Sequence, residues 1–143
     1  MNTPGQTPSS DQEAPATLQR IAELLPALGY SISGSNEGGL YLDLPSCRAC
    51  IRQAHTHIEI IGGAQQEDGD YEHAFSWAEN FHANNFMPTM LPTVNQATGD
   101  VHLFGSFRIP TAWGYTDAQL AEQVGIGLDA VAKAIDGYRK GYL

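Results

Sequence analysis

The sequence predicts an α+β domain: an antiparallel sheet of about five strands with helices packed on one side, in the order α-βββ-α-ββ-α. Three observations lead to this fold class. Residues 40–44 and 101–109 alternate apolar and polar side chains, as half-buried antiparallel strands do. Residues 71–81 and 116–138 repeat apolar side chains at helical spacing. Stretches rich in glycine, proline and asparagine separate these segments and indicate turns.

The length and the charge of the chain limit its size class and its partners. Its 143 residues suit one domain, and 42% of them are hydrophobic, which argues against a wholly disordered chain. Seven Lys and Arg against 16 Asp and Glu give a net charge of −9. This balance opposes binding to nucleic acid or to anionic membranes, which takes clustered cations. Because the sequence shows neither a secretory signal nor a membrane-spanning stretch, we expect a cytoplasmic protein.

The N-terminal segment differs in composition from the rest of the chain. Residues 1–15 are rich in Pro, Ser, Thr and Gln and carry little apolar surface. Such a segment cannot bury enough apolar area to offset the entropy lost on ordering it. We therefore expect a disordered tail over 1–15 and a folded domain over 16–143.

The first helix is expected over residues 18–28. Four apolar residues share one of its faces: Leu18, Ile21, Leu25 and Leu28. Thr17 is a suitable N-cap and Gly29 a suitable C-terminal stop. Pro26 lacks a backbone donor, so it should kink or end the helix about one turn early.

Three strands are expected next, at 30–33, 40–44 and 56–60, with a turn over 34–39. Residues 51–55 read as strand leading into the third of them. In that strand Thr56, Ile58 and Ile60 should face one way, and His55, His57 and Glu59 the other.

The second helix is expected from Tyr71 to Phe81, with Asn84–Asn85 as its exit. Residues 87–94 look extended but contain Pro88 and Pro92. Their even spacing places both missing donors on one edge, which a sheet tolerates only at an edge strand or a bulge.

The last helix has the clearest start signal. Thr116 and Gln119 form a capping box. Behind it runs an apolar stripe: Leu120, Val124, Leu128, Val131, Ile135 and Tyr138. Gly125 and Gly127 each cost about 1 kcal/mol relative to alanine, so packing must hold that turn.

Two cysteines and two histidines are the first candidates for chemistry. A redox Cys-x-x-Cys pair works from a helix N-terminus, but Cys47 and Cys50 lead into a strand. An offset of three along a strand also points the two sulfurs to opposite faces. His55 and His57 follow too closely for a familiar zinc site. We expect packing cysteines and no metal; a metal- or redox-responsive sensor built on these four residues is the alternative.

The remaining motifs do not indicate catalysis. The sequence lacks a Gly-x-Ser-x-Gly elbow, a Cys–His signature and a phosphate-binding glycine loop with its lysine. The acidic residues 67–70 lack the alternating ligands of a calcium loop. We therefore expect no catalytic residues, no cofactor and no enzymatic activity.

Aromatic and amide side chains are the remaining candidates for function. Most aromatic residues complete a core, and core packing is the simpler interpretation. The alternative is a partner-binding interface, because interfaces use exposed aromatic anchors. The candidates lie around the second helix and before the last one: Trp77, Asn80, Asn84, Phe86, Trp113 and Tyr115.

Four segments set helix ends and packing: 24–30 (LLPALGY), 77–86 (WAENFHANNF), 99–107 (GDVHLFGSF) and 116–120 (TDAQL). Together they resemble the bacterial YbjN family from about Leu18 to the C-terminus. The sequence departs from the family pattern at Pro26, at the cysteine pair and at Trp113–Gly114.

The resemblance implies a twisted antiparallel sheet packed by helices, similar to type III secretion chaperones and often dimeric. Members of the family are designated regulators of sensory transduction, and they have no agreed catalytic residues. We therefore expect a non-enzymatic, protein-binding or chaperone-like regulatory module. Its partner is expected to be a protein client or a second copy of the chain.

Overall fold

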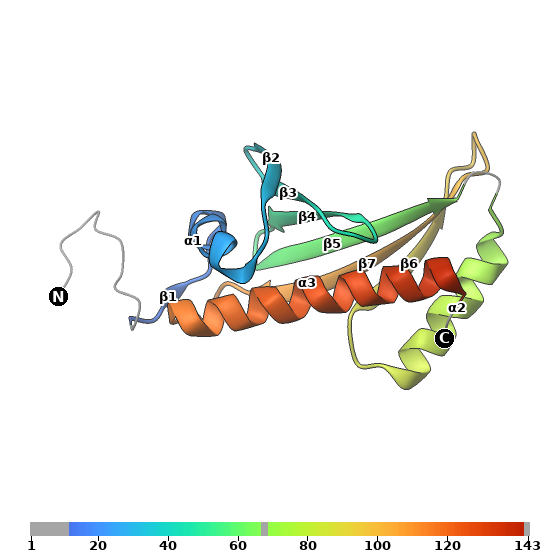
Figure 1. Ribbon diagram of the computed structural model, residues 1–143. Helices are drawn as coiled ribbons and strands as arrows, with labels where there is room; N and C mark the ends of the chain where they lie inside the picture. The colour runs from blue at the N-terminus through green and yellow to red at the C-terminus, as the bar shows by residue number, and fades with distance from the viewer. Residues whose placement is uncertain (1–11, 67–68, 142–143) are drawn as a thin grey trace.

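The computed structural model describes residues 12–66 and 69–141 and has the predicted α+β architecture. A long helix crosses one face of a six-stranded antiparallel sheet (Figure 1), whose strand order is β2-β3-β4-β5-β7-β6. The elements are β1 (Ala14–Pro15), α1 (Leu18–Leu24), a 3-10 helix (Pro26–Leu28), β2 (Ile32–Asn36), β3 (Gly39–Asp43), β4 (Arg48–Gln53), β5 (His57–Gln66), α2 (Tyr71–Asn84), β6 (Thr89–Val94), β7 (Val101–Pro110), β8 (Gly114–Tyr115) and α3 (Asp117–Lys140).

The main sheet has one strand more than the sequence predicts. Residues 51–60 do not form one strand; the chain reverses at 54–56, where the Ala54 amide donates to the His57 carbonyl at 2.8 Å. Ala-His-Thr carries no glycine or proline, so it gives no turn signal. β5 also continues through Gly62 and Gly63 to Gln66, where the sequence indicates a loop.

The N-terminal corner is held by one buried arginine. β1 pairs with β8, and the Arg20 guanidinium donates to the carbonyls of Ala14 at 2.6 Å and of Tyr115 at 2.8 Å. It also donates to Asp117 at the start of α3, at 3.1 Å. Ala14–Pro15 therefore belong to the folded part, whereas residues 1–11 of the predicted tail lie outside the described residues.

The predicted helix ends are confirmed. The Thr17 hydroxyl accepts from the Arg20 amide at 3.2 Å. α1 ends at Leu24, and Pro26 opens the short 3-10 helix, as expected of a residue without an amide proton. At α3, the Thr116 hydroxyl accepts from the Gln119 amide at 3.2 Å, and the Gln119 side chain accepts from the Thr116 amide at 2.9 Å.

Small residues bring α3 close to the covered face of the sheet. A Cβ atom on Gly62 of β5 would lie 2.6 Å from Val131 of α3. A Cβ atom on Gly127 of α3 would lie 2.7 Å from the tip of Ile60. Both distances are too short for carbon atoms, so the glycines permit the contact between helix and sheet. This close packing holds the glycine-containing turn of α3.

β6 is an edge strand, as Pro92 within it and Pro88 just before it predict. Its other neighbour is α2, and the Met90 amide donates to Nε2 of His82 at 2.9 Å. Pro88 and Pro92 lie two residues either side of Met90, so their missing donors belong to the same edge. Pro88 and Pro92 have no backbone N–H group, and the N–H group of Met90 is bonded to His82. The outer edge of β6 therefore has no free amide at these positions for pairing with another strand.

Candidate functional site

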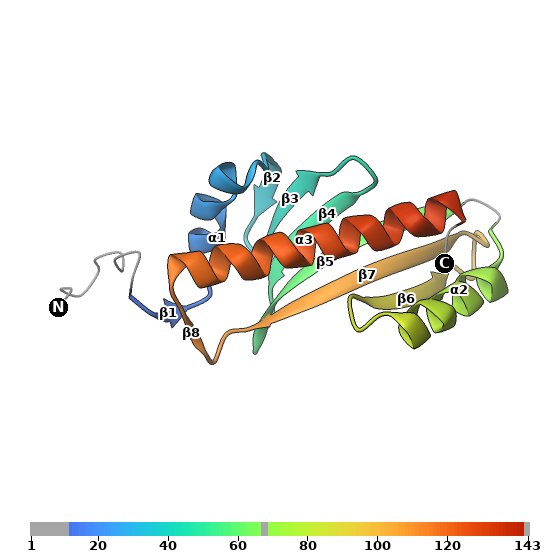
Figure 2. The same cartoon turned by 60° about the horizontal axis from the view of Figure 1, so that its bottom comes forward.

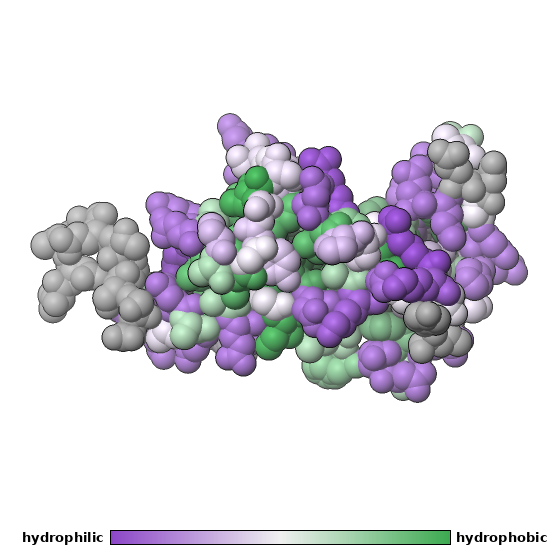
Figure 3. Space-filling model, in the orientation of Figure 1, coloured by the Kyte–Doolittle hydropathy of each residue, from purple (hydrophilic) through white to green (hydrophobic). Residues whose placement is uncertain are grey.

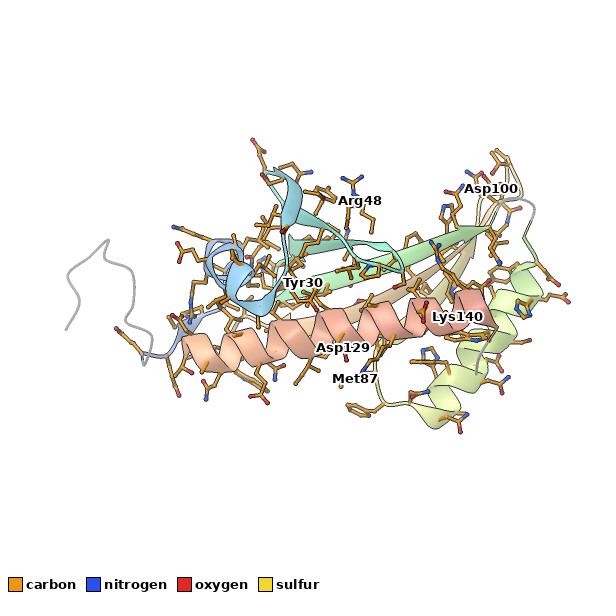
Figure 4. The ribbon with its side chains drawn as sticks, in the orientation of Figure 1. Tyr30, Arg48, Met87, Asp100, Asp129 and Lys140 are labelled. Carbon is orange, nitrogen blue, oxygen red and sulfur yellow. The ribbon has the colours of Figure 1, made fainter. Side chains whose placement is uncertain are left out.

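A groove between α2 and α3 carries Trp77, one of the predicted site residues. From α2 and the turn after it, Trp77, Phe81 and Met87 line the groove. Ala130 and Ala134 of α3 form the opposite wall, and the volume is about 470 Å³. Asp129, which pairs with Lys133 at 2.9 Å, stands on the rim. Figure 4 shows Met87 directly beneath Asp129.

Aromatic rings hold the floor of the groove. The Trp77 and Phe81 rings stack with centroids 5.3 Å apart, and the Trp77 and Tyr138 rings meet in a T-shaped arrangement with centroids 5.3 Å apart. The Tyr138 hydroxyl donates to the Gln66 side chain at 2.6 Å. Burial, and then the charge of Asp70, raise the pKa of Tyr138, so the phenol stays protonated as that donor. These contacts give the groove a floor that is formed before any partner arrives.

The turn after α2 exposes two apolar side chains, of which Met87 lines the groove and Phe86 lines a separate hollow at the end of α2. Phe86 is fully exposed, and Met87 is 40% exposed. Asn80 and Asn84 are exposed on α2, where the Asn84 side chain donates to the Asn80 carbonyl at 2.8 Å. Figure 3 shows hydrophobic residues at the surface below α3, on the side where α2 lies. Met87 is absent from the sequence prediction, because the pattern places it at the start of a strand.

The six predicted residues do not form one surface. Trp77 and Tyr115 are buried, at 4% and 8% exposure, and the Tyr115 hydroxyl donates to the Pro110 carbonyl at 2.8 Å. For Tyr115 the core-packing interpretation holds, whereas Trp77 reaches the groove floor. Trp113 is 66% exposed beside β8, which lies at the other end of the molecule from α2 (Figure 2). Sequence proximity to a helix therefore does not bring these aromatics together.

The cysteines and histidines are not arranged as a metal or redox site. Cys47 lies on the helix side of the sheet and Cys50 on the other, and both are free thiols. Burial raises the pKa of both thiols, which disfavours reactive thiolates. His55 lies in the turn before β5, so the prediction that it shares a strand face with His57 is wrong. Within residues 12–66 and 69–141, no three His, Cys, Asp or Glu side chains gather as metal ligands.

The comparison with solved structures supports the fold. In the described part of the chain, no helix has the length and apolarity to cross a bilayer. No protein-family model and no curated protein matches the sequence. A crystal structure of YbjN, a candidate transcription regulator from E. coli, is similar with a TM-score of 0.69 and 15% identity, and the match covers 91% of this chain and 97% of that chain. The chain therefore has a YbjN-like fold, as its sequence motifs predict.

Proposed function

We propose that this chain is a protein-binding regulatory module without bond-making chemistry, and that it seats an amphipathic helix of another protein in the groove between α2 and α3. The observation that carries the proposal is the aromatic groove floor beside the exposed Phe86 and Met87. Removing one such side chain from water contributes roughly 1.5–3 kcal/mol. A partner that covers Phe86 and the exposed part of Met87 would gain one such contribution and a fraction of a second before the costs of binding, whereas Trp77 is already buried and serves as a wall.

The chemistry of the groove favours a helix as its occupant. An amphipathic helix lays its apolar stripe into a hydrophobic groove, and methionine adapts to the shape of such a stripe. Asp129 and Lys133 at the rim offer both charge signs to polar side chains that flank the stripe. Two copies of a chain with net charge −9 repel each other, which favours a different protein over a second copy.

Site-specific photo-crosslinking tests this proposal. A photoreactive phenylalanine analogue at position 86 should crosslink the chain to its partner protein and give one product of fixed mass. The same analogue at Trp113, which is exposed far from the groove, is the matched control and should give none. Ala130→Arg fills the groove from α3 and should abolish the product at position 86.

The outcomes separate the alternatives. Equal crosslinking at both positions, or a product that persists in Ala130→Arg, would overturn the groove as the site. A product with twice the mass of the chain would make a second copy the occupant and overturn the client proposal. A peptide mapped from the product should then change the fluorescence of Trp77 in Trp113→Phe, where Trp77 is the remaining tryptophan of the two.

A further inference from the structure

The face of the sheet opposite α3 bears no helix within the described residues; we refer to it as the open face. Strand register arranges its outward side chains in three rows. The cross-strand rows are Arg52–Glu59–Arg108, Cys50–Ile61–Ser106 and Arg48–Gly63–Phe104. Figure 4 shows Arg48 pointing away from α3. These positions alternate with the buried residues of the same strands, so the open face is a regular surface set by β-sheet geometry.

The open face concentrates positive charge in an acidic chain. Arg48, Arg52 and Arg108 are three of the seven basic residues, and their side chains are 66%, 56% and 68% exposed. Glu59 lies between two of them, 2.7 Å from Arg52 and 3.7 Å from Arg108. The Glu59 carboxylate is therefore shared between two guanidinium groups. Arg48 reaches Asp43 at only 3.7 Å, so it too has donors directed to solvent.

A shallow apolar hollow lies at Cys50, which stands between Arg48 and Arg52 along β4, and Arg48 is one of its lining residues. Tyr41, Cys50, Ile61, Gly63 and Phe104 contribute to its lining, and its volume is about 190 Å³. The Phe104 ring packs over Gly63, where a Cβ atom would lie only 2.8 Å from it, so the absence of a side chain at Gly63 lets this ring form one wall of the hollow. The tyrosine and phenylalanine rings on either side suit one apolar side chain.

We propose that the open face binds an extended acidic segment of another protein, with one apolar side chain in the hollow and a carboxylate at each end. Arg48 and Arg52 are four residues apart on β4, which corresponds to roughly 13 Å. An extended peptide spans this distance with acidic residues four positions apart and an apolar residue midway. Guanidinium groups bind carboxylates through paired hydrogen bonds, which fixes the position of the peptide.

Two other occupants fit the charges less well. A nucleic acid would meet the repulsion of a chain with net charge −9, and three arginines supply few phosphate contacts. A second copy docked by the same face would place arginines against arginines. The proposal concerns a surface separate from the α2–α3 groove, and it stands or falls independently of the proposed function.

Peptide titration of the isotope-labelled full chain, followed by NMR at low salt, tests the proposal. The probe is the acetylated, amidated peptide ESFSE, and its neutral counterpart is QSFSQ. We expect ESFSE to shift the amides of β4, β5 and β7 and to bind at least tenfold more tightly than QSFSQ. The double variant Arg48→Gln, Arg52→Gln should weaken ESFSE binding about tenfold. The matched control Lys133→Gln, Lys140→Gln removes two exposed cations of α3 and should leave it unchanged.

Several results would overturn the proposal. These are the absence of shifts with ESFSE, equal affinity for QSFSQ, shifts confined to the α2–α3 groove, and equal weakening by the lysine control. Tighter binding of a five-nucleotide thymidine oligomer would make the face a phosphate site and would also overturn it. Gly63→Ala, which narrows the hollow and keeps every charge, provides a second variant and should weaken ESFSE severalfold.

Discussion

The two faces of the main sheet differ in what their side chains contact. Ile60 and Ile61 are neighbours on β5, yet Ile60 is fully buried under α3 while Ile61 is only partly buried on the open face. The covered face is aliphatic, and its glycines permit a close helix contact. The open face carries arginines with incomplete partners around a shallow hollow. This difference indicates that stability is concentrated on the covered face, while the open face is available for binding.

Alanine at the two neighbouring isoleucines gives the largest expected contrast. Ile60→Ala should lower the free energy of unfolding by about 2–5 kcal/mol, because it leaves a cavity under α3. Ile61→Ala should lower it by about 1 kcal/mol, because solvent reaches the vacated space. Urea unfolding measures both values. Equal losses in the two variants would contradict the proposed division between the faces.

The arginines give the next contrast. Arg20 is buried at 8% exposure, and its bonds to two strands and to α3 hold the N-terminal corner. Arg20→Met should cost about 1.5–3 kcal/mol, the range for hydrogen bonds that involve a charged group. Arg108→Gln on the open face should change stability by no more than about 0.5 kcal/mol. Thermal unfolding of both variants checks this, and a larger loss in Arg108→Gln would argue for a structural role.

Adjacent glycines on opposite faces offer a matched pair. Gly62→Ala places a methyl group 2.6 Å from Val131 in the packed core and should cost about 1–3 kcal/mol. Gly63→Ala meets the Phe104 ring, which is partly exposed and lies outside the core under α3, so it should cost less than about 1 kcal/mol. The check is the urea midpoint of each variant, and the reverse order would refute the expected packing.

The smallest effect depends on pH. Burial raises the pKa of Glu59. Hydrogen bonds from Ser106 and Arg52 and the positive charges of Arg52 and Arg108 lower it by more, so the pKa of Glu59 is lowered on folding. The associated stability is present above the ordinary glutamate pKa of about 4.3 and is lost as the pH falls below it. The natural chain should therefore lose more stability than Glu59→Gln between pH 5 and pH 3. Parallel stability curves for the two proteins would be evidence against this carboxylate network.

Local chemistry explains which parts of the fold were predictable. The sequence predicts two helix ends and one edge strand correctly, because Pro26, the capping box of α3 and the pair Pro88 and Pro92 act on their own backbone. The turn at 54–56 lacks turn residues. In the sequence, Gly62 and Gly63 look like loop residues. Gly62 is required by its contact with Val131 of α3, which is far away in the sequence, so the local pattern does not reveal the strand. Helix ends can thus be predicted from neighbouring residues, whereas close packing between distant segments cannot.

The candidate sites were harder to predict for the same reason. Aromatic character does not separate a buried Tyr115 from an exposed Phe86. The open-face row joins Arg52 and Glu59 to Arg108, and only strand register brings these residues together. A sequence signal did exist in part: the outward positions of β4 alternate Arg, Cys and Arg. The face they share becomes visible only once β4 and β5 are recognised as two strands.

The most direct test measures two properties on one pair of variants, Gly62→Ala and Gly63→Ala. For each variant, the free energy of unfolding and the affinity for ESFSE are determined under conditions where the protein is folded. If the covered face holds the fold and the open face binds, Gly62→Ala loses stability and keeps its affinity, while Gly63→Ala keeps its stability and loses affinity severalfold. Stability and affinity that fall together in both variants would contradict the account.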